Sequence, residues 1–349
     1  MSETPLLATN AVTRHFRLGG LLSRRTLHAV DDVDLEIGEH EIVALVGESG
    51  SGKSTMARLL ALLYRPTSGR ILFRGQDVAK LRSRSDLRRY RAQVPIVFQD
   101  PYSSINPVYR VSHGVLRALA LHRPELSRAE RQKEAERVFE TVGLSPAREM
   151  LRKFPYEMSG GQRQRVGFAQ ALAVNPALIL ADEPVSMLDV SIRAGILNLM
   201  RDLRDRTGVS ILFITHDIAS ARYVADRIAV MYAGNLVEIG PTEDVLADAR
   251  HPYSQLLVSA VPDPRSPSDI EVAAGAGEPP KVIDPKPGCR FQPRCPIAIE
   301  MCKTVTPRLS PMGPEHGAAC HVAAANVAAG RPPVETIAAP ISVAAQGRA

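Results

Sequence analysis

Gly47-Glu48-Ser49-Gly50-Ser51-Gly52-Lys53-Ser54-Thr55 is the stretch that decides the fold of this chain. It fits the pattern G-x-x-x-x-G-K-[ST], in which a glycine-rich loop cradles phosphate groups. The apolar residues 42–46 before it predict a buried strand, and residues 56–63 after it favour a helix. A strand, a tight turn and a helix start aim several N–H groups at one anion. We therefore expect phosphate binding here, the alternative being a surface turn that happens to contain a lysine.

Individual positions of this loop have separate roles. Gly47, Gly50 and Gly52 allow backbone angles that side chains would forbid. Lys53 can reach the β- and γ-phosphates of a nucleotide, and Ser54 can offer its hydroxyl to Mg²⁺.

Bulk properties set the outer limits of the interpretation. The 349 residues are 45% hydrophobic and 23% charged, which suits one large globular domain plus an appendage. No apolar run approaches the roughly 20 residues that span a bilayer, and the first residues carry no secretory signal. We therefore expect a cytosolic chain. The net charge of +6 does not by itself identify a partner.

Polar residues follow two further buried strands. The apolar run 177–181 ends in Asp182 and Glu183, and the run 209–215 delivers His216. Two adjacent carboxylates at a strand end are costly unless a cation such as nucleotide-bound Mg²⁺ sits there. A lone histidine is usually structural or on the surface, but this one follows a strand expected in the same parallel sheet, where strand ends form the site.

Three more segments are candidates for the same site. Ser159-Gly160-Gly161-Gln162 predicts a capped helix running to about Val174, whose N-terminus offers a second phosphate site. A capped helix without a ligand is the alternative. Gln99 ends a buried strand over 94–98. Phe16 lies on a strand 31 residues before Gly47, and its ring either stacks on adenine or belongs to the core.

The remaining chain divides by composition. Residues 5–46 alternate as short strands, with separate runs over 27–33 and 33–37, residues 111–157 favour helices, and 226–240 favours a hairpin. The arginines between residues 82 and 91 predict a solvated helix face rather than a nucleic-acid patch. A Pro-, Gly- and Ala-rich linker is expected over 262–280, followed by a Cys-containing segment (281–322) and a disordered tail (323–349).

Taken together, these motifs in this order resemble the ATP-binding subunit of an ABC transporter over about residues 8–321. Ser159–Gln162 is similar to the ABC signature, Leu178–Glu183 to the Walker B strand, Ser186–Asp189 to the D-loop, and Gln99 and His216 to the Q-loop glutamine and the switch histidine. The resemblance implies an α/β P-loop ABC ATPase cassette over residues 5–261. Its parts are a RecA-like core, an antiparallel β subdomain and a helical subdomain at about 100–172.

A narrower resemblance points to the ATPases of oligopeptide and dipeptide importers. It is carried by Phe98–Pro107, by His251-Pro252-Tyr253 and by Gly288–Pro296. Gln162 and Tyr102 lean toward the second ATPase of such systems. The same branch includes nickel and some sugar importers, so the solute stays open between these and peptides. A small irregular Cys-containing C-terminal domain over 281–322 is implied.

The resemblance also implies roles for named residues. Two cassettes sandwich two ATP molecules, each signature (Ser159, Gly160, Gly161, Gln162) facing the partner's ATP. Phe16 stacks adenine, and the loop Gly47, Glu48, Ser49, Gly50, Ser51, Gly52, Lys53, Ser54 and Thr55 holds the phosphates. Mg²⁺ is surrounded by Ser54, Gln99 and Asp182. Glu183 polarises the attacking water, His216 contacts the γ-phosphate, and Asp189 touches the partner subunit.

The implied partners are a second ABC ATPase, two membrane permease subunits and an extracytoplasmic substrate-binding protein. The second ATPase is either the same chain or a paralogue, and a paralogue is expected. No nucleic-acid partner is expected, and the chain is placed at the cytoplasmic face of the membrane. A soluble ABC ATPase of translation or DNA repair is disfavoured, because such chains usually carry two cassettes or a long coiled-coil insertion.

All four cysteines lie between Cys289 and Cys320, in the pattern C-x5-C-x6-C-x17-C. In a reducing cytosol this clustering favours a metal site over disulfides. Spacing alone leaves Zn²⁺, an iron–sulfur cluster and ordinary buried cysteines open. Some importers of the resembling branch carry a [4Fe-4S] cluster at matching places. This implies Cys289, Cys295, Cys302 and Cys320 as ligands, with the cluster ahead of Zn²⁺ and with His316 and His321 as outside candidates.

Overall fold

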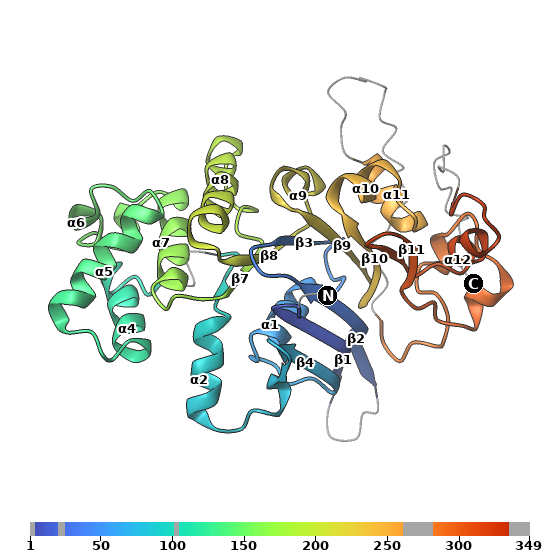
Figure 1. The fold of residues 1–349 in the computed structure, drawn as a ribbon, viewed down its shortest axis with the longest axis horizontal. Helices are drawn as coiled ribbons and strands as arrows, with labels where there is room; N and C mark the ends of the chain where they lie inside the picture. Colours follow the sequence, from blue (N-terminus) through green and yellow to red (C-terminus); the bar gives the residue numbers. More distant parts are fainter. Residues whose placement is uncertain (1–3, 20–24, 101–104, 261–281, 335–349) are drawn as a thin grey trace.

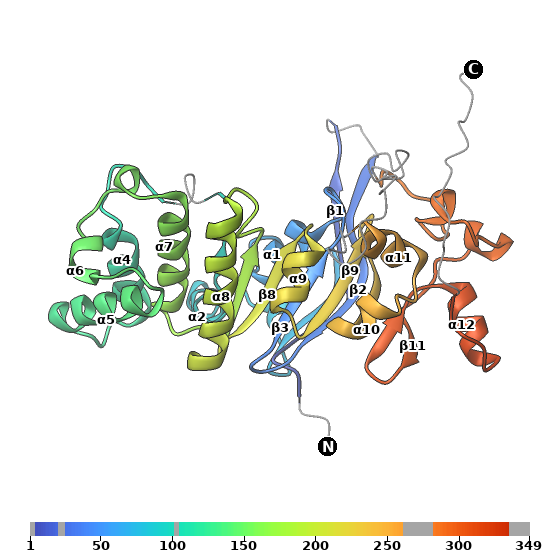
Figure 2. The ribbon, with the colours of Figure 1, turned by 90° about the horizontal axis from the view of Figure 1, so that it is seen from above.

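The computed structural model describes residues 4–19, 25–100, 105–260 and 282–334, and within them a large mixed sheet forms the centre (Figures 1 and 2). Strands β9, β3, β8, β7 and β6 run parallel, whereas β10, β11 and β12 pair antiparallel at one edge. In order across the sheet, the strands are β11 (Ser310–Gly313), β12 (His316–Ala318), β10 (Asn235–Pro241), β9 (Arg227–Tyr232), β3 (Ile42–Val46), β8 (Ser210–Thr215), β7 (Leu178–Asp182) and β6 (Ile96–Val97).

Strand β3 shows why this sheet must be covered on both faces. Its five residues are fully buried. Ile42, Ala44 and Val46 face one hydrophobic core, whereas Val43 and Leu45 face the other. Because successive side chains of a strand alternate, a strand without a polar residue is stable only between two apolar layers. The phosphate loop therefore leaves β3 from the middle of a packed sandwich.

A second, antiparallel sheet covers one of these faces together with helix α1 (Lys53–Leu60) (Figure 1). The predicted separate runs over 27–33 and 33–37 form one strand instead. Asp32, with φ 53°, makes a bulge rather than a turn, so pairing with β1 continues past it. The strands in order are β2 (Thr26–Ile37), β1 (Leu7–Arg17), β4 (Ser68–Phe73) and β5 (Gln76–Asp77).

Helices complete the core and the helical subdomain, which lies at one end of the molecule (Figure 1). The arginines of α2 are exposed, as a solvated face requires. The helices are α2 (Arg84–Gln93), α4 (Ser112–His122), α5 (Arg128–Thr141), α6 (Ala147–Met150), α7 (Gly160–Leu172), α8 (Val190–Thr207), α9 (Ile218–Val224), α10 (Thr242–Ala247), α11 (Pro252–Ser259) and α12 (His321–Ala328). Short 3-10 turns are η1 (Val78–Lys80), η2 (Pro155–Glu157), η3 (Gln292–Arg294) and η4 (Glu300–Lys303).

The C-terminal region differs from its prediction in two respects. It is not separate from the cassette, because the β11–β12 hairpin pairs with β10 and extends the central sheet. The sequence His316-Gly317-Ala318 shows no alternation, so its strand is fixed only by its partner. The predicted disordered tail is wrong for residues 323–334, where α12 continues to Ala328 and Val334 is buried. The linker 262–280, Tyr102 and residues 335–349 lie outside the described residues.

Candidate functional site

The phosphate loop is shaped by glycines that meet other backbone segments. Gly47 has φ 150°, and a Cβ there would lie 2.2 Å from the carbonyl oxygen of Met231. Gly52 has φ 106°, and a Cβ there would lie 2.3 Å from the carbonyl oxygen of Ala29. Any side chain at either position would collide with fixed main chain. The loop is therefore clamped between β2 and the end of β9.

Lys53 is buried and holds the loop together from inside. Its Nζ donates to the carbonyl oxygens of Gly47, at 2.7 Å, and of Glu48, at 2.9 Å. Burial lowers the pKa of Lys53, against the opposing attraction of Glu183, Asp182 and Glu48. A buried ammonium whose hydrogen-bond partners are neutral oxygens is only partly compensated, which suits a group that awaits anionic phosphate.

Ser54 and Asp182 meet beside the loop, as a shared Mg²⁺ site requires. The Ser54 hydroxyl donates to Asp182 Oδ1 at 2.8 Å, although the two residues lie 128 positions apart. Burial raises the pKa of Asp182, and the nearby Glu183 adds to this, whereas Ser54, Arg58 and Lys53 lower it. A hydroxyl and a carboxylate in contact are oxygen donors of the kind that Mg²⁺ prefers.

Glu183 sits at the centre of the remaining candidates. Its Oε2 accepts a 3.2 Å hydrogen bond from Gln99 Nε2 and lies 3.4 Å from His216 Nδ1. Its backbone is left-handed, with φ 46°, a conformation that a non-glycine residue adopts only when its surroundings impose it. Three predicted residues from the ends of β6, β7 and β8 are thus brought together at one edge of the sheet.

Phe16 is half-buried on β1, and its surroundings are aromatic and cationic. The Arg14 guanidinium lies 4.5 Å from the ring centre, and the Tyr64 ring meets Phe16 edge-on at 5.4 Å. This cluster is compatible with a stacking partner for a flat base. Its role in adenine binding stays a prediction.

The signature forms the predicted capped helix start. Ser159 Oγ accepts from the Gln162 N–H, and Gln162 Oε1 accepts from the Ser159 N–H, which makes a complete capping box at α7. The signature opens α7 in the helical subdomain, whereas the phosphate loop lies between β3 and α1 (Figure 1). Beyond β7, Met187 and Val190 are 62% and 79% exposed beside Asp189. Exposed apolar residues there suit a contact with a second subunit.

The four cysteines gather in the C-terminal region. Cys302 is buried, the other three are half-buried, and the Cys289 N–H donates to the Cys302 carbonyl oxygen at 2.8 Å. Burial raises the pKa of Cys289 to about 11 and that of Cys295 to about 12, and the neighbouring thiols act in the same direction. Mutual electrostatic influence of this kind requires thiols that are near one another.

Glu48 has partners that the sequence pattern did not indicate. Its N–H donates to the Tyr253 hydroxyl at 2.9 Å, and its carboxylate lies 3.3 Å from the Arg294 guanidinium. Both residues lie in stretches that the sequence marked for other reasons. No acidic residue stands between Asp284 and Glu300 to suggest a partner for Arg294, so no local signal could have found this pair.

A cleft of about 190 Å³ opens between the end of β6 and helix α7, lined among others by Phe98, Gln164, Gly167 and Gln170. Gln164 is 1% exposed, and in the described part of the chain its Nε2 has no hydrogen-bond partner. A buried amide without a partner is rare in a finished interior. This cleft lies next to the Q-loop residue Gln99.

Two family models match the chain. One, described as ABC transporter, matches residues 30–186, and the other, described as oligopeptide/dipeptide transporter, C-terminal region, matches residues 237–302. A probable peptide ABC transporter ATP-binding protein of Sinorhizobium fredii is 45% identical over 330 residues, covering 93% of this chain and 92% of that protein. The oligopeptide transport ATP-binding protein AppF of Bacillus subtilis is 39% identical over 326 residues, covering 92% and 98%.

Solved structures confirm the cassette fold. The ATP-binding cassette MJ0796, in a dimeric post-hydrolysis state bound to ADP and phosphate, superposes with a TM-score of 0.60 at 30% identity. The superposition covers 68% of this chain and 98% of the MJ0796 chain. The cbiO1 protein of Clostridium perfringens, part of the ABC transporter complex cbiONQ, gives a TM-score of 0.61 at 26% identity, covering 70% and 92%.

Proposed function

This chain belongs to the family of ATP-binding subunits of peptide ABC transporters, and we propose that it hydrolyses ATP to drive peptide import through membrane permeases. The observation that carries this proposal is the convergence of Ser54, Gln99, Asp182, Glu183 and His216 at one sheet edge beside the phosphate loop. The relatives at 39–45% identity are named for peptide or oligopeptide transport. Nickel or sugar import is the alternative role of the same machinery.

The residues of this edge divide the work of phosphoryl transfer. Lys53 and the loop amides hold the phosphates, and the existing bonds of Lys53 to loop carbonyls keep its ammonium in place before nucleotide arrives. Mg²⁺ held at Ser54, Gln99 and Asp182 would neutralise phosphate charge. Glu183 accepts the proton of the attacking water or orients that water. The side chain of His216 lies beside Glu183, is 57% exposed, and is assigned to the γ-phosphate.

A second cassette completes each site. One phosphate loop leaves the far side of the γ-phosphate open, and the capped start of α7 offers N–H groups and a helix dipole to cover it. We assign Ser159–Gln162 to the partner's ATP and Asp189 to the subunit contact. The exposed Met187 and Val190 support this assignment. The partner is a paralogue or the same chain, and a paralogue is our proposal.

The permease contact is assigned to the extended Q-loop segment 98–107, of which residues 101–104 lie outside the described residues, and to the cleft beside it between β6 and α7. None of the helices in the described residues is both long enough and apolar enough to cross a bilayer. The solute path in this family lies in separate permease subunits, and a substrate-binding protein outside the membrane completes our proposal. The unpartnered Gln164 amide and the exposed Phe98 suit a short permease helix at this cleft. The subunit then works as a peripheral protein at the cytoplasmic face.

Reconstitution tests the function directly. The chain is expressed with candidate permease subunits and a candidate second ATPase from the same genome, and the complex is purified through a tag on one permease. Recovery of this chain with ATP hydrolysis that a peptide-loaded binding protein stimulates is the expected result. Stimulation by nickel or a sugar, and not by peptides, would replace the solute assignment. Recovery only with ribosomes or DNA would overturn the transporter role.

The cysteine region is assigned a structural [4Fe-4S] cluster held by Cys289, Cys295, Cys302 and Cys320. Four free thiols gathered in one region, one of them buried and three half-buried, form a donor set suited to a cationic metal centre. The resemblance to importers that carry a [4Fe-4S] cluster at matching places puts the cluster ahead of Zn²⁺ in this proposal.

The two outside candidates each use one ring nitrogen elsewhere: His316 Nε2 is 2.7 Å from the buried Glu238, and His321 Nε2 is 2.9 Å from the Val305 carbonyl oxygen. Those two nitrogens are therefore not available to the cluster. Protein purified without oxygen should be brown and contain iron and sulfide. A colourless protein with one zinc would replace the cluster but keep the ligands, and freely alkylated cysteines without any metal would overturn both.

A further inference from the structure

Three side chains of the segment Cys289–Cys295, those of Arg290, Phe291 and Arg294, are buried against the ATPase core. Phe291 is 1% exposed, and its ring packs against Tyr232 at 5.3 Å and Tyr253 at 5.5 Å between centroids. The side chains of Arg290 and Arg294 on either side are only 12% and 13% exposed. Two arginines buried by so short a segment cost desolvation unless each finds an anion.

Arg294 finds its anion on the phosphate loop itself. Its Nη1 lies 3.3 Å from Glu48 Oε2 and its Nη2 lies 3.4 Å from Glu48 Oε1, a two-pronged approach to one carboxylate. The same Nη1 donates to the Tyr232 hydroxyl at 3.3 Å. Glu48 is the second residue of the loop, and its side chain is 22% exposed. The contact therefore spans 246 positions of sequence and ends on a side chain of the phosphate loop.

The main chain of Glu48 is a hub of the phosphate loop. Its carbonyl oxygen accepts from Lys53 Nζ at 2.9 Å and from the Ser51 N–H at 3.2 Å. Its N–H donates to the Tyr253 hydroxyl at 2.9 Å. With Arg294 on its carboxylate, Glu48 is held at every polar group. A shift of this residue would move the carbonyl that orients Lys53.

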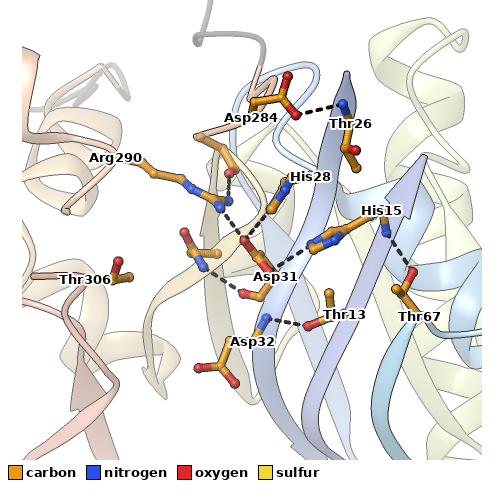
Figure 3. A network of polar contacts seen from close by, with 12 residues as sticks. Thr13, His15, Thr26, His28, Asp31, Asp32, Thr67, Asp284, Arg290 and Thr306 are labelled. Atoms are coloured by element: carbon orange, nitrogen blue, oxygen red, sulfur yellow. Dashed lines mark hydrogen bonds and ion pairs between the residues drawn. The ribbon is translucent and has the colours of Figure 1, made fainter. Parts of the chain in front are cut away.

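Arg290 makes a parallel connection through Asp31 (Figure 3). Its guanidinium bonds Asp31 and the carbonyl oxygen of Ala233, in the turn between β9 and β10. The next residue of that turn, Gly234, donates its N–H to the Ser51 carbonyl oxygen at 2.9 Å. The cysteine-bearing segment thus reaches the phosphate loop at Glu48 directly and at Ser51 through one turn.

His15, His28 and Asp31 lie as close together as the ligands of a metal ion, but they serve this connection instead. Asp31 takes 3.1 Å and 2.9 Å contacts from the two rings and the bond from Arg290 (Figure 3). Burial opposes the charged carboxyl, yet the histidine bonds and Arg290 hold the pKa of Asp31 below its usual value. A carboxylate already paired with a guanidinium leaves little attraction for a second cation.

We propose that Arg294 is a positioning residue for ATP binding, and that the segment 289–295 sets the geometry of the phosphate loop through Glu48. This proposal rests on the proposed function of residues 47–55 as the ATP phosphate cradle. Arg294 touches no phosphate; it acts by holding Glu48, whose carbonyl oxygen holds Lys53. Removing the Arg294 side chain should therefore change the affinity for ATP more than the rate at which bound ATP is hydrolysed.

The test measures MgATP affinity of the full chain by calorimetry. Arg294→Ala should weaken binding by about tenfold, because Glu48, whose carbonyl oxygen orients Lys53, is then no longer held in place. Arg294→Lys should restore part of it, because an ammonium keeps the charge but not the fork. Lys303→Ala is the matched control, since Lys303 pairs with the exposed Glu300 in the same region. In the assembled complex, Arg294→Ala should raise KM for ATP more than it lowers kcat.

A double-mutant cycle separates positioning from general loss of structure. In a Glu48→Ala background, Arg294→Ala should cause no further loss of affinity. An equal fold-change in both backgrounds, or unchanged affinity in Arg294→Ala alone, overturns the proposal. If Arg294→Ala lacks a cooperative unfolding transition, Arg294→Lys and Arg294→Gln carry the same cycle. A wild-type chain that binds no ATP would contradict the proposed function instead.

Discussion

Ser54 Oγ donates a 2.8 Å hydrogen bond to Asp182 Oδ1, which joins the phosphate loop after β3 to the end of β7. The two strands are not neighbours, because β8 lies between them in the sheet. The bond therefore forms because the order of the strands in the sheet brings the Ser54 hydroxyl and the Asp182 carboxylate together. It places the expected Mg²⁺ ligands in contact before any cation is bound.

Asp182→Asn tests this contact. The amide can still accept from Ser54, but it no longer supplies a negative charge to a divalent cation, so the Mg²⁺ concentration at half-maximal ATPase activity should rise by about tenfold or more. Mg²⁺ titration of the assembled complex measures this. Asp205→Asn on α8, at a 59% exposed side chain, is the control and should leave the midpoint unchanged. An unmoved midpoint in Asp182→Asn would contradict the assignment.

Glu183→Gln should abolish turnover and leave ATP bound. The glutamine can replace the hydrogen bond to Gln99, but it cannot take a proton from water, and general-base catalysis contributes about 10²–10⁴ in rate. Bound nucleotide should accumulate and the cassettes should stay closed as a dimer in size-exclusion chromatography. Glu243→Gln, at a 71% exposed position, serves as control. Near wild-type hydrolysis in Glu183→Gln would reject Glu183 as the catalytic carboxylate.

Val108→Asp should impair transport without changing nucleotide affinity. Val108 is 74% exposed directly after the extended Q-loop segment 98–107, and a charge there should disrupt an apolar permease contact. Peptide uptake by the reconstituted complex and MgATP affinity of the isolated chain are compared. Leu121→Asp, on a 46% exposed residue near the end of α4, should preserve uptake. Loss of affinity in Val108→Asp, with the complex intact, would contradict the assignment to the permease.

Stability should fall as the pH decreases from about 6.5 to about 4, in part through His251. Burial lowers the pKa of this imidazole to about 4, with Glu238 opposing, whereas the unfolded value is 6.5. The unfolded chain therefore takes up the proton first, at a cost of up to about 1.4 kcal/mol per pH unit. His251→Asn keeps a capping side chain for α11 and removes the titration. Urea unfolding across this range should show a shallower pH slope for the variant, and parallel curves would exclude His251.

The sequence alone determined the cassette fold and the candidate members of the site. A phosphate loop can be recognised from local sequence, because its glycines, lysine and hydroxyl lie within nine consecutive residues. Buried strands such as 42–46 and 209–215 are readable for the same reason, since burial on both faces demands unbroken apolar runs. Polar residues at the ends of such apolar runs, as Asp182 and His216 are, can be assigned to one site because the ends of parallel strands meet at one edge.

Only the tertiary structure decided which distant groups touch. The left-handed backbone of Glu183 and the pairing of β12 with β10 depend on neighbours that no local periodicity encodes. The Glu48–Arg294 pair is the clearest case, because its partners are 246 positions apart and the arginine lies in a proline-rich stretch without an acidic neighbour. Local sequence patterns determine the secondary structure of a segment. The energy of a long-range ion pair is gained only after folding has brought its two residues together.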